Sequence, residues 1–461
     1  MKKMISLLLS VIMTLAIFLS TFTAQAAVYK PDVELYSKAY MLINLDDNSF
    51  PIVAEKNVDE KLYPASLTKM VTAMVALNNV SDLSETTTVS KQSHDILLGT
   101  GAQIAQLKVG DSITVEDLLY LTLVHSACDA TEVLAEYVGG TREKFVEMMN
   151  EYVESLGCEN THFTNPDGLH DDNHYTTVSD MAKISLDAVK NETFMKISTT
   201  VQYKYGNTNF YHTNLMLRSG YVSYFYKYAQ GIKTGSTSEA GYCVVTKASK
   251  DGYNYLAIVM GAPVIDYNND GYKEKCSFID AASLFKWAFN SLKYSTLIES
   301  NEVVDEIAVK SGKDADLVQL VAKNDVTTIV PSSLDKSTII IEPIDKPENI
   351  SAPIKKGDFV CKANIKYADQ VVATVDLVAA NDVELSTFLK IVNAIKSFFS
   401  LLIVKIILFV VLILGVVYIS LFINNMNKKK KRRQEEIEED SSNNNNRRNR
   451  GKDDLPPPRR R

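Results

Sequence analysis

Hydrophobic and polar positions in the first part of the chain recur with two periodicities, one typical of strands and the other of helices. Apolar residues dominate 35–44 and return at 52–54 after a polar turn at 46–48, which predicts a pair of strands. From residue 64 to 77 the apolar positions recur at helical spacing, which predicts a buried helix.

The same periodicities continue through residues 27–295 and define the fold class of this region. Further helices are expected at 115–124, 130–138, 142–156 and 178–189, and further strands at 231–235, 242–247 and 255–260. Because the three strands follow one another closely, we expect them to pair antiparallel. The sequence therefore predicts an α+β domain over 27–295, with helices on the faces of an antiparallel sheet.

Beyond residue 298 the pattern changes to short β-rich runs separated by turns. These runs lie at 302–309, 326–330, 338–341, 359–367 and 371–377. This spacing predicts a second, small all-β domain over 298–380.

Both ends of the chain carry apolar segments that point to a membrane. Lys2 and Lys3 precede an apolar run that ends near the small-residue site 24–26, so residues 1–26 are predicted to be a secretory signal peptide, with an uncleaved anchor helix as the alternative. Residues 406–423 form an uncharged run of 18 residues, or about 27 Å as a helix. The predicted transmembrane helix covers 398–423.

Charge is distributed unevenly and suggests an orientation in that membrane. From residue 428 onward 13 Lys and Arg stand against 7 Asp and Glu, although the whole chain carries a formal charge of −7. The basic run 428–433 predicts that this end faces the cytoplasm and that the main body of a single-pass protein faces outward. Residues 424–461 are predicted to be disordered. The acidic main body disfavours nucleic acid as a partner.

The cysteines and histidines do not form a recognisable metal or redox motif. The five cysteines are odd in number and widely spaced, so the chain has no disulfide framework, although one pair stays possible. No C-x-x-C or H-E-x-x-H occurs, and the closest histidine pair, His170 and His174, lies in a loop rich in Asp and Asn. We therefore expect no metal and no cofactor.

A candidate nucleophile opens the buried helix at Ser66-Leu67-Thr68-Lys69, where Ser66 and Lys69 lie one turn apart. A serine hydroxyl needs an adjacent base, and an amine can serve when burial or a second cation lowers its pKa. The same S-x-x-K spacing occurs at Ser283 and Ser333, so the motif is weak by itself. Ser333 is expected in a turn, and Ser283 on a helix with no K-T-G after it.

Two further short motifs suggest where a substrate is held. Lys233-Thr234-Gly235 lies on a predicted strand, where the ammonium and the hydroxyl could bind a carboxylate and the glycine allows a ligand to approach closely. Ser126-Ala127-Cys128 lies between two predicted helices, where a buried serine could relay protons beside Lys69. Each motif alone is as typical of an ordinary hairpin or interhelical turn.

Together the three motifs resemble the serine penicillin-recognising superfamily, whose pattern is S-x-x-K, then S-x-N, then K-T-G. The flanking stretches 63–70, 163–177 and 233–243 look like the low-molecular-mass D-alanyl-D-alanine carboxypeptidases, and the resemblance covers about residues 33–380. It implies a DD-peptidase or β-lactamase-like catalytic domain followed by the β-rich domain.

The resemblance also implies a reaction. Ser66 attacks a peptidoglycan stem peptide ending in D-Ala-D-Ala, Lys69 acts as the base, and Ser126 helps to pass the proton to the departing D-Ala. Water then hydrolyses the acyl-enzyme. β-Lactams are expected to acylate Ser66 as covalent inhibitors.

For binding, the resemblance implies that Lys233, Thr234 and Gly235 hold the terminal carboxylate. The oxyanion is expected between the backbone N–H groups of the nucleophile and Ser236. One residue departs from the family's pattern: Cys128 stands where Asn is usual, and a thiol is a weak hydrogen-bonding partner. Cys128 is still expected in the substrate-binding loop.

Two other functions fit parts of the pattern. A class A β-lactamase adds an E-x-x-L-N segment for deacylation, and none occurs between Cys128 and Lys233. A non-catalytic, membrane-tethered wall-binding protein would fit the altered position 128, but the nucleophile and both lysines are intact. A carboxypeptidase at the cell membrane is the favoured interpretation.

Overall fold

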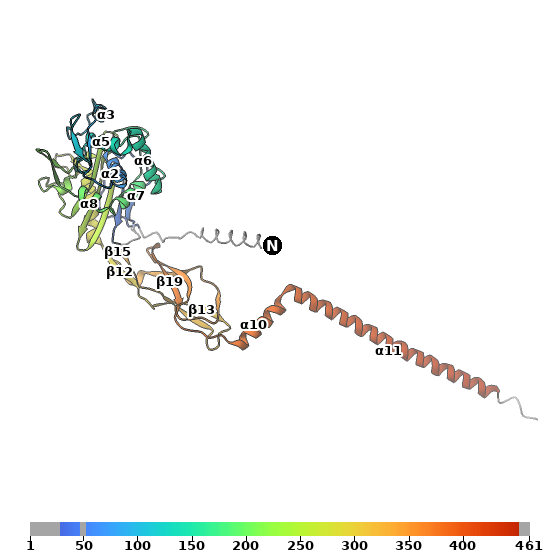
Figure 1. Cartoon of the computed structure of the whole chain (residues 1–461). Helices are drawn as coiled ribbons and strands as arrows, with labels where there is room; N and C mark the ends of the chain where they lie inside the picture. Colours follow the sequence, from blue (N-terminus) through green and yellow to red (C-terminus); the bar gives the residue numbers. More distant parts are fainter. Residues whose placement is uncertain (1–27, 47–51, 451–461) are drawn as a thin grey trace, which may run out of the picture. The chain divides into compact units, whose positions relative to one another are not determined.

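The computed structural model describes residues 28–46 and 52–450, so the predicted signal peptide and the last residues of the tail lie outside it (Figure 1). Two compact units are distinguished, and the larger contains the sheet and helices that carry all the predicted site residues. In Figure 1 helices α2, α5, α6 and α7 gather in this larger unit.

A five-stranded sheet forms the centre of the larger unit, and neighbouring strands run antiparallel throughout. Its order, β2-β1-β9-β8-β7, places the first strand pair beside a hairpin from much later in the chain. The antiparallel sheet predicted from the sequence is confirmed. Its strands are β1 (Ala39–Asn44), β2 (Ile52–Lys56), β7 (Ala229–Thr237), β8 (Gly241–Lys250) and β9 (Tyr253–Ala262).

Both faces of this sheet are buried, because helices cover each of them. On β1, Met41 and Ile43 pack into the core with the early helices, whereas Tyr40 and Leu42 pack into a second core with helix α9 (Cys276–Ser291). From Tyr40 to Ile43, the side chains on both faces of β1 are therefore apolar, as expected for a central strand that is covered on both sides.

The predicted helices are present, with small shifts at their ends. Thr114, Thr141 and Thr177 each accept a hydrogen bond from the main-chain N–H three residues later and so fix three helix starts. The predicted helix 115–124 is instead a short α-helix followed by a π-helical turn, Leu121–His125. These helices are α2 (Thr68–Asn79), α4 (Val115–Tyr120), α5 (Cys128–Gly139), α6 (Arg142–Ser155) and α7 (Val178–Ala188). The short helix α8 (Glu192–Ser198) follows them and was not predicted.

Several short elements were not predicted, because each is too short to show a periodic pattern. They are η1 (Ala65–Leu67), α3 (Lys91–Asp95), η3 (Leu215–Leu217), the pair β3 (Thr86–Thr88) and β4 (Ser112–Thr114), the pair β5 (Gln202–Tyr205) and β6 (Thr208–Tyr211), and the pair β10 (Val264–Ile265) and β11 (Glu274–Lys275).

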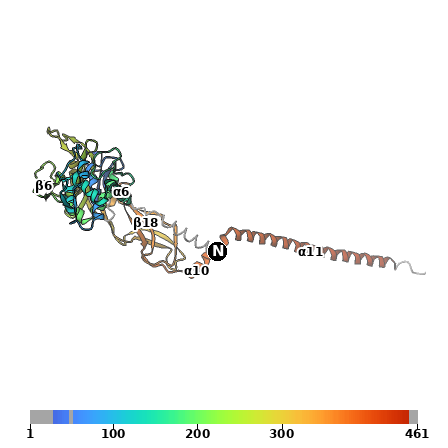
Figure 2. The ribbon, with the colours of Figure 1, turned by 45° about the horizontal axis from the view of Figure 1, so that its top comes forward.

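The β-rich region forms a six-stranded sheet of order β16-β18-β19-β14-β13-β17 and a separate strand pair. The run predicted at 326–330 becomes β15 (Val326–Pro331), but it pairs with β12 (Leu292–Ile298) and stays outside the larger sheet. Figure 2 shows β18 from a second side. The remaining strands are β13 (Val303–Lys310), β14 (Leu317–Ala322), β16 (Ile340–Ile344), β17 (Asn349–Ser351), β18 (Phe359–Tyr367) and β19 (Gln370–Ala379), with η4 (Lys336–Thr338) before β16.

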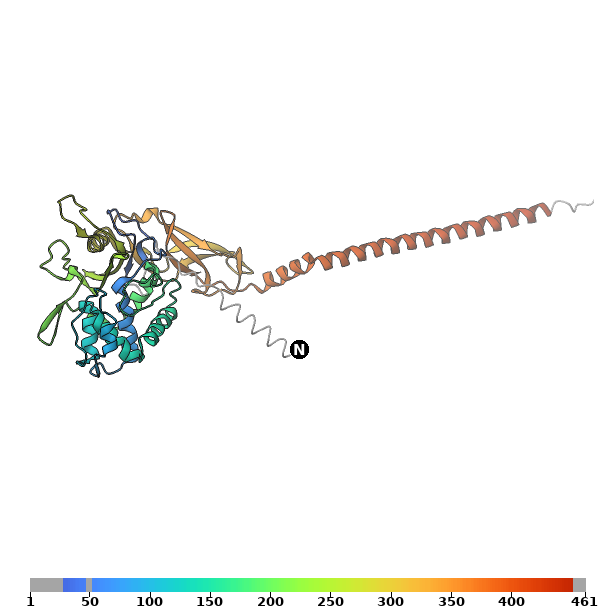
Figure 3. The same cartoon turned by 90° about the horizontal axis from the view of Figure 1, so that it is seen from above.

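The C-terminal part is helical in two segments, α10 (Thr387–Ser400) and α11 (Leu402–Arg450), which Figure 3 shows end to end. The sequence analysis predicts disorder from residue 424, whereas the structure describes a helix as far as residue 450. Lys, Arg, Gln and Glu are good helix formers, and acidic residues four positions after the basic run 428–433 favour a helix. Within 402–439, α11 is long and apolar enough to cross a membrane.

Candidate active site

Ser66 and Lys69 lie on consecutive turns at the start of α2. Ser66 is in the short helix η1 and half-buried, whereas Lys69 is completely buried. Lys69 Nζ lies 3.0 Å from Ser66 Oγ and donates to it in the protonated form. The one-turn spacing therefore gives the contact between hydroxyl and amine that nucleophile activation requires.

The amine of Lys69 is held by two further groups from different elements. It donates to the main-chain oxygen of Asp167, in the loop before α7, and it lies 3.4 Å from Cys128 Sγ at the start of α5. With three contacts and no exposed surface, the Lys69 side chain is fixed in place, which preorganises it beside Ser66.

Ser126 and Lys233 form a second contact across the site. Ser126 follows the π-helical turn with φ 65°, a left-handed conformation that directs the chain into α5. Lys233 Nζ donates to Ser126 Oγ at 2.8 Å and to the main-chain oxygen of Thr234 at 2.9 Å. Lys233 is completely buried, and burial together with nearby Lys69 holds its pKa well below its ordinary range.

Strand β7 packs directly against the turn that carries the nucleophile. A side chain added at Gly235 would lie 2.7 Å from the oxygen of Pro64 and 3.0 Å from the nitrogen of Ser66, so only glycine allows this approach. Thr234 Oγ1 donates to Thr213 Oγ1 at 2.7 Å, and Ser236 is exposed on the same strand. The K-T-G strand therefore forms one wall of the site.

Cys128 is almost fully buried at the start of α5, with its main-chain N–H bonded to the oxygen of Gln103 at 2.8 Å. Burial raises the pKa of the Cys128 thiol, and Lys69 opposes that rise. The group beside Lys69 is therefore a thiol at neutral pH. All five cysteines are free and buried, so the disulfide pair left open by the sequence does not form.

Three buried residues near Lys69 have roles that the sequence analysis did not assign. His174 is buried, within 2.8 Å of Thr68 Oγ1 and 3.1 Å of the main-chain N–H of Thr164, and burial lowers its pKa to about 4. It is therefore a neutral structural residue, buried within the loop in which the sequence analysis placed it.

The other two missed residues, Asp167 and Glu132, form a buried carboxyl pair. Burial, followed by the charge of Asp167, raises the pKa of Glu132 to about 8, while Arg142 Nε lies 3.1 Å from both Glu132 oxygens. A side-chain hydrogen bond between the two residues also favours the protonated form of Glu132. The sequence did contain a signal for Glu132, because this charged residue lies among the apolar positions of the helix that became α5.

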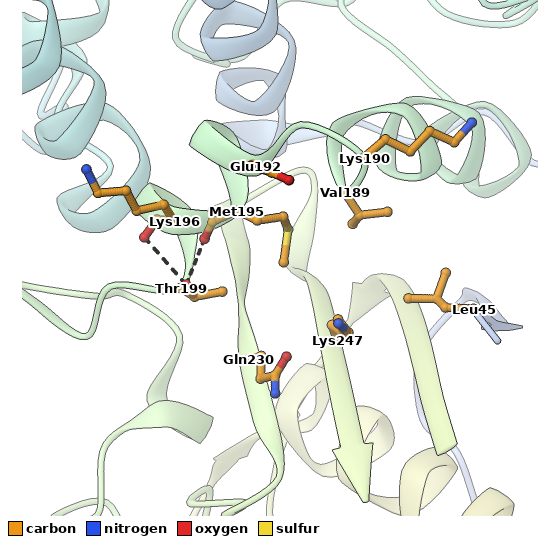
Figure 4. Close-up of a pocket in the computed structure, with 9 residues that line it drawn as sticks. All are labelled: Leu45, Val189, Lys190, Glu192, Met195, Lys196, Thr199, Gln230 and Lys247. Carbon is orange, nitrogen blue, oxygen red and sulfur yellow. Dashed lines mark hydrogen bonds between the residues drawn. The ribbon is translucent and has the colours of Figure 1, made fainter. Parts of the chain in front are cut away.

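A cavity of the main unit lies apart from these groups. It has a volume of about 600 Å³ and is lined by α8 and the edge of β7 and β8 (Figure 4). Thr199 in its wall donates back to the main-chain oxygen of Met195 at 2.7 Å. None of the S-x-x-K, Ser126 or K-T-G side chains lines it, so the chemistry does not belong to this cavity.

These groups define a serine hydrolase of the acyl-enzyme type. The site combines a serine beside one buried lysine, a second buried lysine opposite, and a strand that approaches the serine at a glycine. Comparison with known proteins gives the family. Residues 23–264 match the family described as D-alanyl-D-alanine carboxypeptidase, and residues 293–385 match the C-terminal domain of penicillin-binding protein 5. The chain belongs to the D-alanyl-D-alanine carboxypeptidase family.

Individual relatives agree with this assignment. The carboxypeptidase DacF of Bacillus subtilis (strain 168) is 29% identical over 342 residues, covering 73% of this chain and 83% of that one. DacC of Escherichia coli (strain K12) is 30% identical over 291 residues, covering 61% and 67%. The crystal structure of penicillin-binding protein 5 from Haemophilus influenzae is similar with a TM-score of 0.58 and 27% identity, covering 78% and 100%.

Proposed function

We propose that the protein removes the terminal D-Ala from peptidoglycan stem peptides through an acyl-enzyme on Ser66. The contact of 3.0 Å between Lys69 Nζ and Ser66 Oγ carries this proposal, because it joins nucleophile and base. Lys69, acting as the base, takes the hydroxyl proton as Ser66 Oγ bonds to the carbonyl carbon of the penultimate D-Ala. The oxyanion is held by the main-chain N–H groups of Ser66 and Ser236.

Collapse of this intermediate breaks the peptide bond and releases D-Ala. The leaving nitrogen needs a proton, and Ser126 Oγ is placed to pass one because it lies 2.8 Å from Lys233 Nζ. Water then attacks the ester on Ser66 and frees the shortened peptide. Cys128, a buried thiol beside Lys69, contributes shape and a weak hydrogen bond to the peptide-binding loop.

The substrate carboxylate is held by Lys233 and Thr234. Because the buried Lys233 ammonium has a lowered pKa in the free protein, an incoming carboxylate raises that pKa and stabilises the charged form. A β-lactam carries a carboxylate and a reactive carbonyl in a similar arrangement and acylates the same serine.

We further propose that the protein is secreted through residues 1–26, which the structure does not describe, and anchored by one transmembrane helix. Support comes from the apolar part of α11, which is long and apolar enough to cross a membrane. The basic run 428–433 favours a cytoplasmic end and an extracytoplasmic catalytic domain. The domains proposed are 27–295, 298–380, a membrane segment within 398–423 and a cytoplasmic end over 424–461.

Labelling of the full-length protein with a fluorescent penicillin tests the active-site assignment. Ser66→Ala is expected to abolish both the label and the release of D-Ala from a stem-peptide mimic. Ser283→Ala, which alters another S-x-x-K sequence on α9, is the matched control and should keep both. Mass spectrometry locates the adduct, and a penicilloyl group on any other residue contradicts the proposal. Penicillin hydrolysis that outpaces D-Ala release would identify a β-lactamase instead.

A further inference from the structure

The hairpin between β10 and β11 carries a spaced set of oxygen-bearing side chains that the peptidase chemistry does not use. Asp266, Asn268 and Asp270 stand at alternate positions, Gly271 follows at once, and Glu274 comes three residues later. In calcium-binding loops the oxygen ligands occupy positions 1, 3, 5, 7 and 9, with glycine at position 6. Counted from Asp266, this hairpin fits each of these positions.

The backbone of the hairpin already has the turn that such a loop requires. Asp266 Oδ1 accepts from the main-chain N–H of Asp270 at 3.0 Å, and Asp266 Oδ2 accepts from that of Gly271 at 2.9 Å. Gly271 has φ +90°, a conformation that L side chains rarely adopt. The first carboxylate therefore organises the loop around itself.

Glu274 provides an independent indication that this hairpin can bind a cation. The residue is only 8% exposed, and its Oε2 has no hydrogen-bond partner among the described residues. An unpaired buried carboxylate is costly, and a cation in contact with it would offset that cost.

We propose that the β10–β11 hairpin is a calcium site formed by Asp266, Asn268, Asp270, the main-chain oxygen of Tyr272, and Glu274. Ca²⁺ takes six to eight oxygen ligands in flexible geometry, which suits this mixture of carboxylates, amide and carbonyl. In the described part of the chain no three acidic, histidine or cysteine side chains converge on one point, so side-chain rotation accompanies binding.

The calcium affinity of this site depends on the residue at position 12 of the loop, counted from Asp266. Calcium loops of high affinity place a bidentate glutamate there, whereas this chain has Ser277, whose buried hydroxyl has no partner among the described residues. With one carboxylate fewer, the dissociation constant falls in the range of extracellular calcium modules, about 0.1–1 mM.

Calcium at this position would stabilise the surroundings of the hairpin. The loop leads directly into α9, whose first residue, Cys276, bonds through its N–H to the oxygen of Pro263 at 3.0 Å. Val264 of β10 also lines a cavity of about 400 Å³ together with Ser236 and Tyr242. The hairpin therefore borders the exposed end of the K-T-G strand.

Isothermal titration calorimetry of the full-length protein in detergent tests the site with calcium chloride, and magnesium chloride serves as the competing cation. We expect one saturable Ca²⁺ site with a dissociation constant of about 0.1–1 mM and at least about tenfold weaker binding of Mg²⁺. Thermal unfolding should shift to higher temperature as calcium is added.

Glu274→Gln and Asp266→Asn remove one ligand charge each, and Asp251→Asn in the exposed Asp251-Gly252 turn is the control. We expect Glu274→Gln to weaken calcium binding at least about tenfold and, without calcium, to unfold at a temperature no lower than wild type, because the unpaired buried charge is gone. Asp251→Asn should bind as wild type does. Absence of saturable binding up to about 10 mM, or wild-type affinity in Glu274→Gln, overturns the proposal. Circular dichroism shows whether each variant is folded, and Glu274→Gln keeps the test valid if Asp266→Asn is not.

Discussion

Cys128 places a thiol beside Lys69, at a position where the family usually has an amide. Its sulfur lies 3.4 Å from Lys69 Nζ, which is longer than the 3.0 Å contact to Ser66 Oγ. A thiol is a weak acceptor, so Lys69 depends more on Ser66 and on the main-chain oxygen of Asp167.

Replacing this thiol by the amide usual in the family is therefore expected to keep the enzyme active. Cys128→Asn adds a donor and an acceptor at the peptide-binding loop, and we expect kcat/KM for D-Ala release to change by no more than about tenfold. Cys158→Ala, at a buried cysteine outside the site, controls for loss of a thiol. Complete loss of turnover in Cys128→Asn would show that this loop is aligned incorrectly.

His174 makes stability depend on pH through a group far from solvent. Its folded pKa of about 4 lies below the ordinary value of 6.5, so between these values the unfolded chain binds a proton that the folded chain does not. Stability is therefore lost as pH falls from about 6.5 to 4, by up to about 3 kcal/mol.

Thermal unfolding of wild type and His174→Gln at pH 7 and pH 5 measures this loss. Gln retains a polar partner for Thr68, and the variant should lose less stability than wild type on acidification. His94→Gln, at a partly exposed histidine, controls for the substitution itself. An equal loss in wild type and His174→Gln would mean that His174 is not the responsible group.

At the scale of elements, the site depends on three segments meeting at the turn before α2. The loop 165–169 and strand β7 both approach the backbone around Ser66, and each does so at a glycine, Gly168 and Gly235. A side chain at Gly168 would fall on the main-chain oxygen of Ala65, so the turn that carries the nucleophile would have to move.

This packing predicts different effects for two glycines that share a positive φ. Gly168→Ala is expected to slow acylation by penicillin at least about 100-fold, because a displacement of about 1 Å is enough for such a loss. Gly157→Ala has nothing within 4 Å of the added carbon, so it should cost only about 1–2 kcal/mol of stability and leave acylation unchanged. Similar acylation rates in the two variants would rule out the steric argument.

At the scale of the whole molecule, the β-rich region is not simply appended to the catalytic body. Strand β15 pairs with β12, and its residue Ile329 belongs to the same buried cluster as Phe285 of α9. Removing all of 298–380 would therefore open that core. The sequence analysis missed this because the pairing joins residues separated by 28 to 39 positions and leaves no local pattern.

The membrane anchor can be tested by ending the chain after Ser386, which removes α10 and α11 and keeps every described strand. We expect the shortened protein to appear in the soluble fraction and to be acylated by fluorescent penicillin at an unchanged rate, because no site residue lies beyond this point. Fractionation of cells expressing both forms is the measurement. Retention of the shortened form in the membrane would indicate a second attachment.

The sequence by itself determined the elements and the chemistry: strands and helices follow from local periodicity, and the S-x-x-K and K-T-G residues carry a recognisable order. Tertiary structure alone decided which groups meet. Lys233 reaches Ser126, and Asp167 reaches both Lys69 and Glu132, across separations of up to 107 positions. Burial, which sets the pKa values of Lys233, Glu132 and His174, likewise depends on packing between distant segments, and no local pattern encodes it.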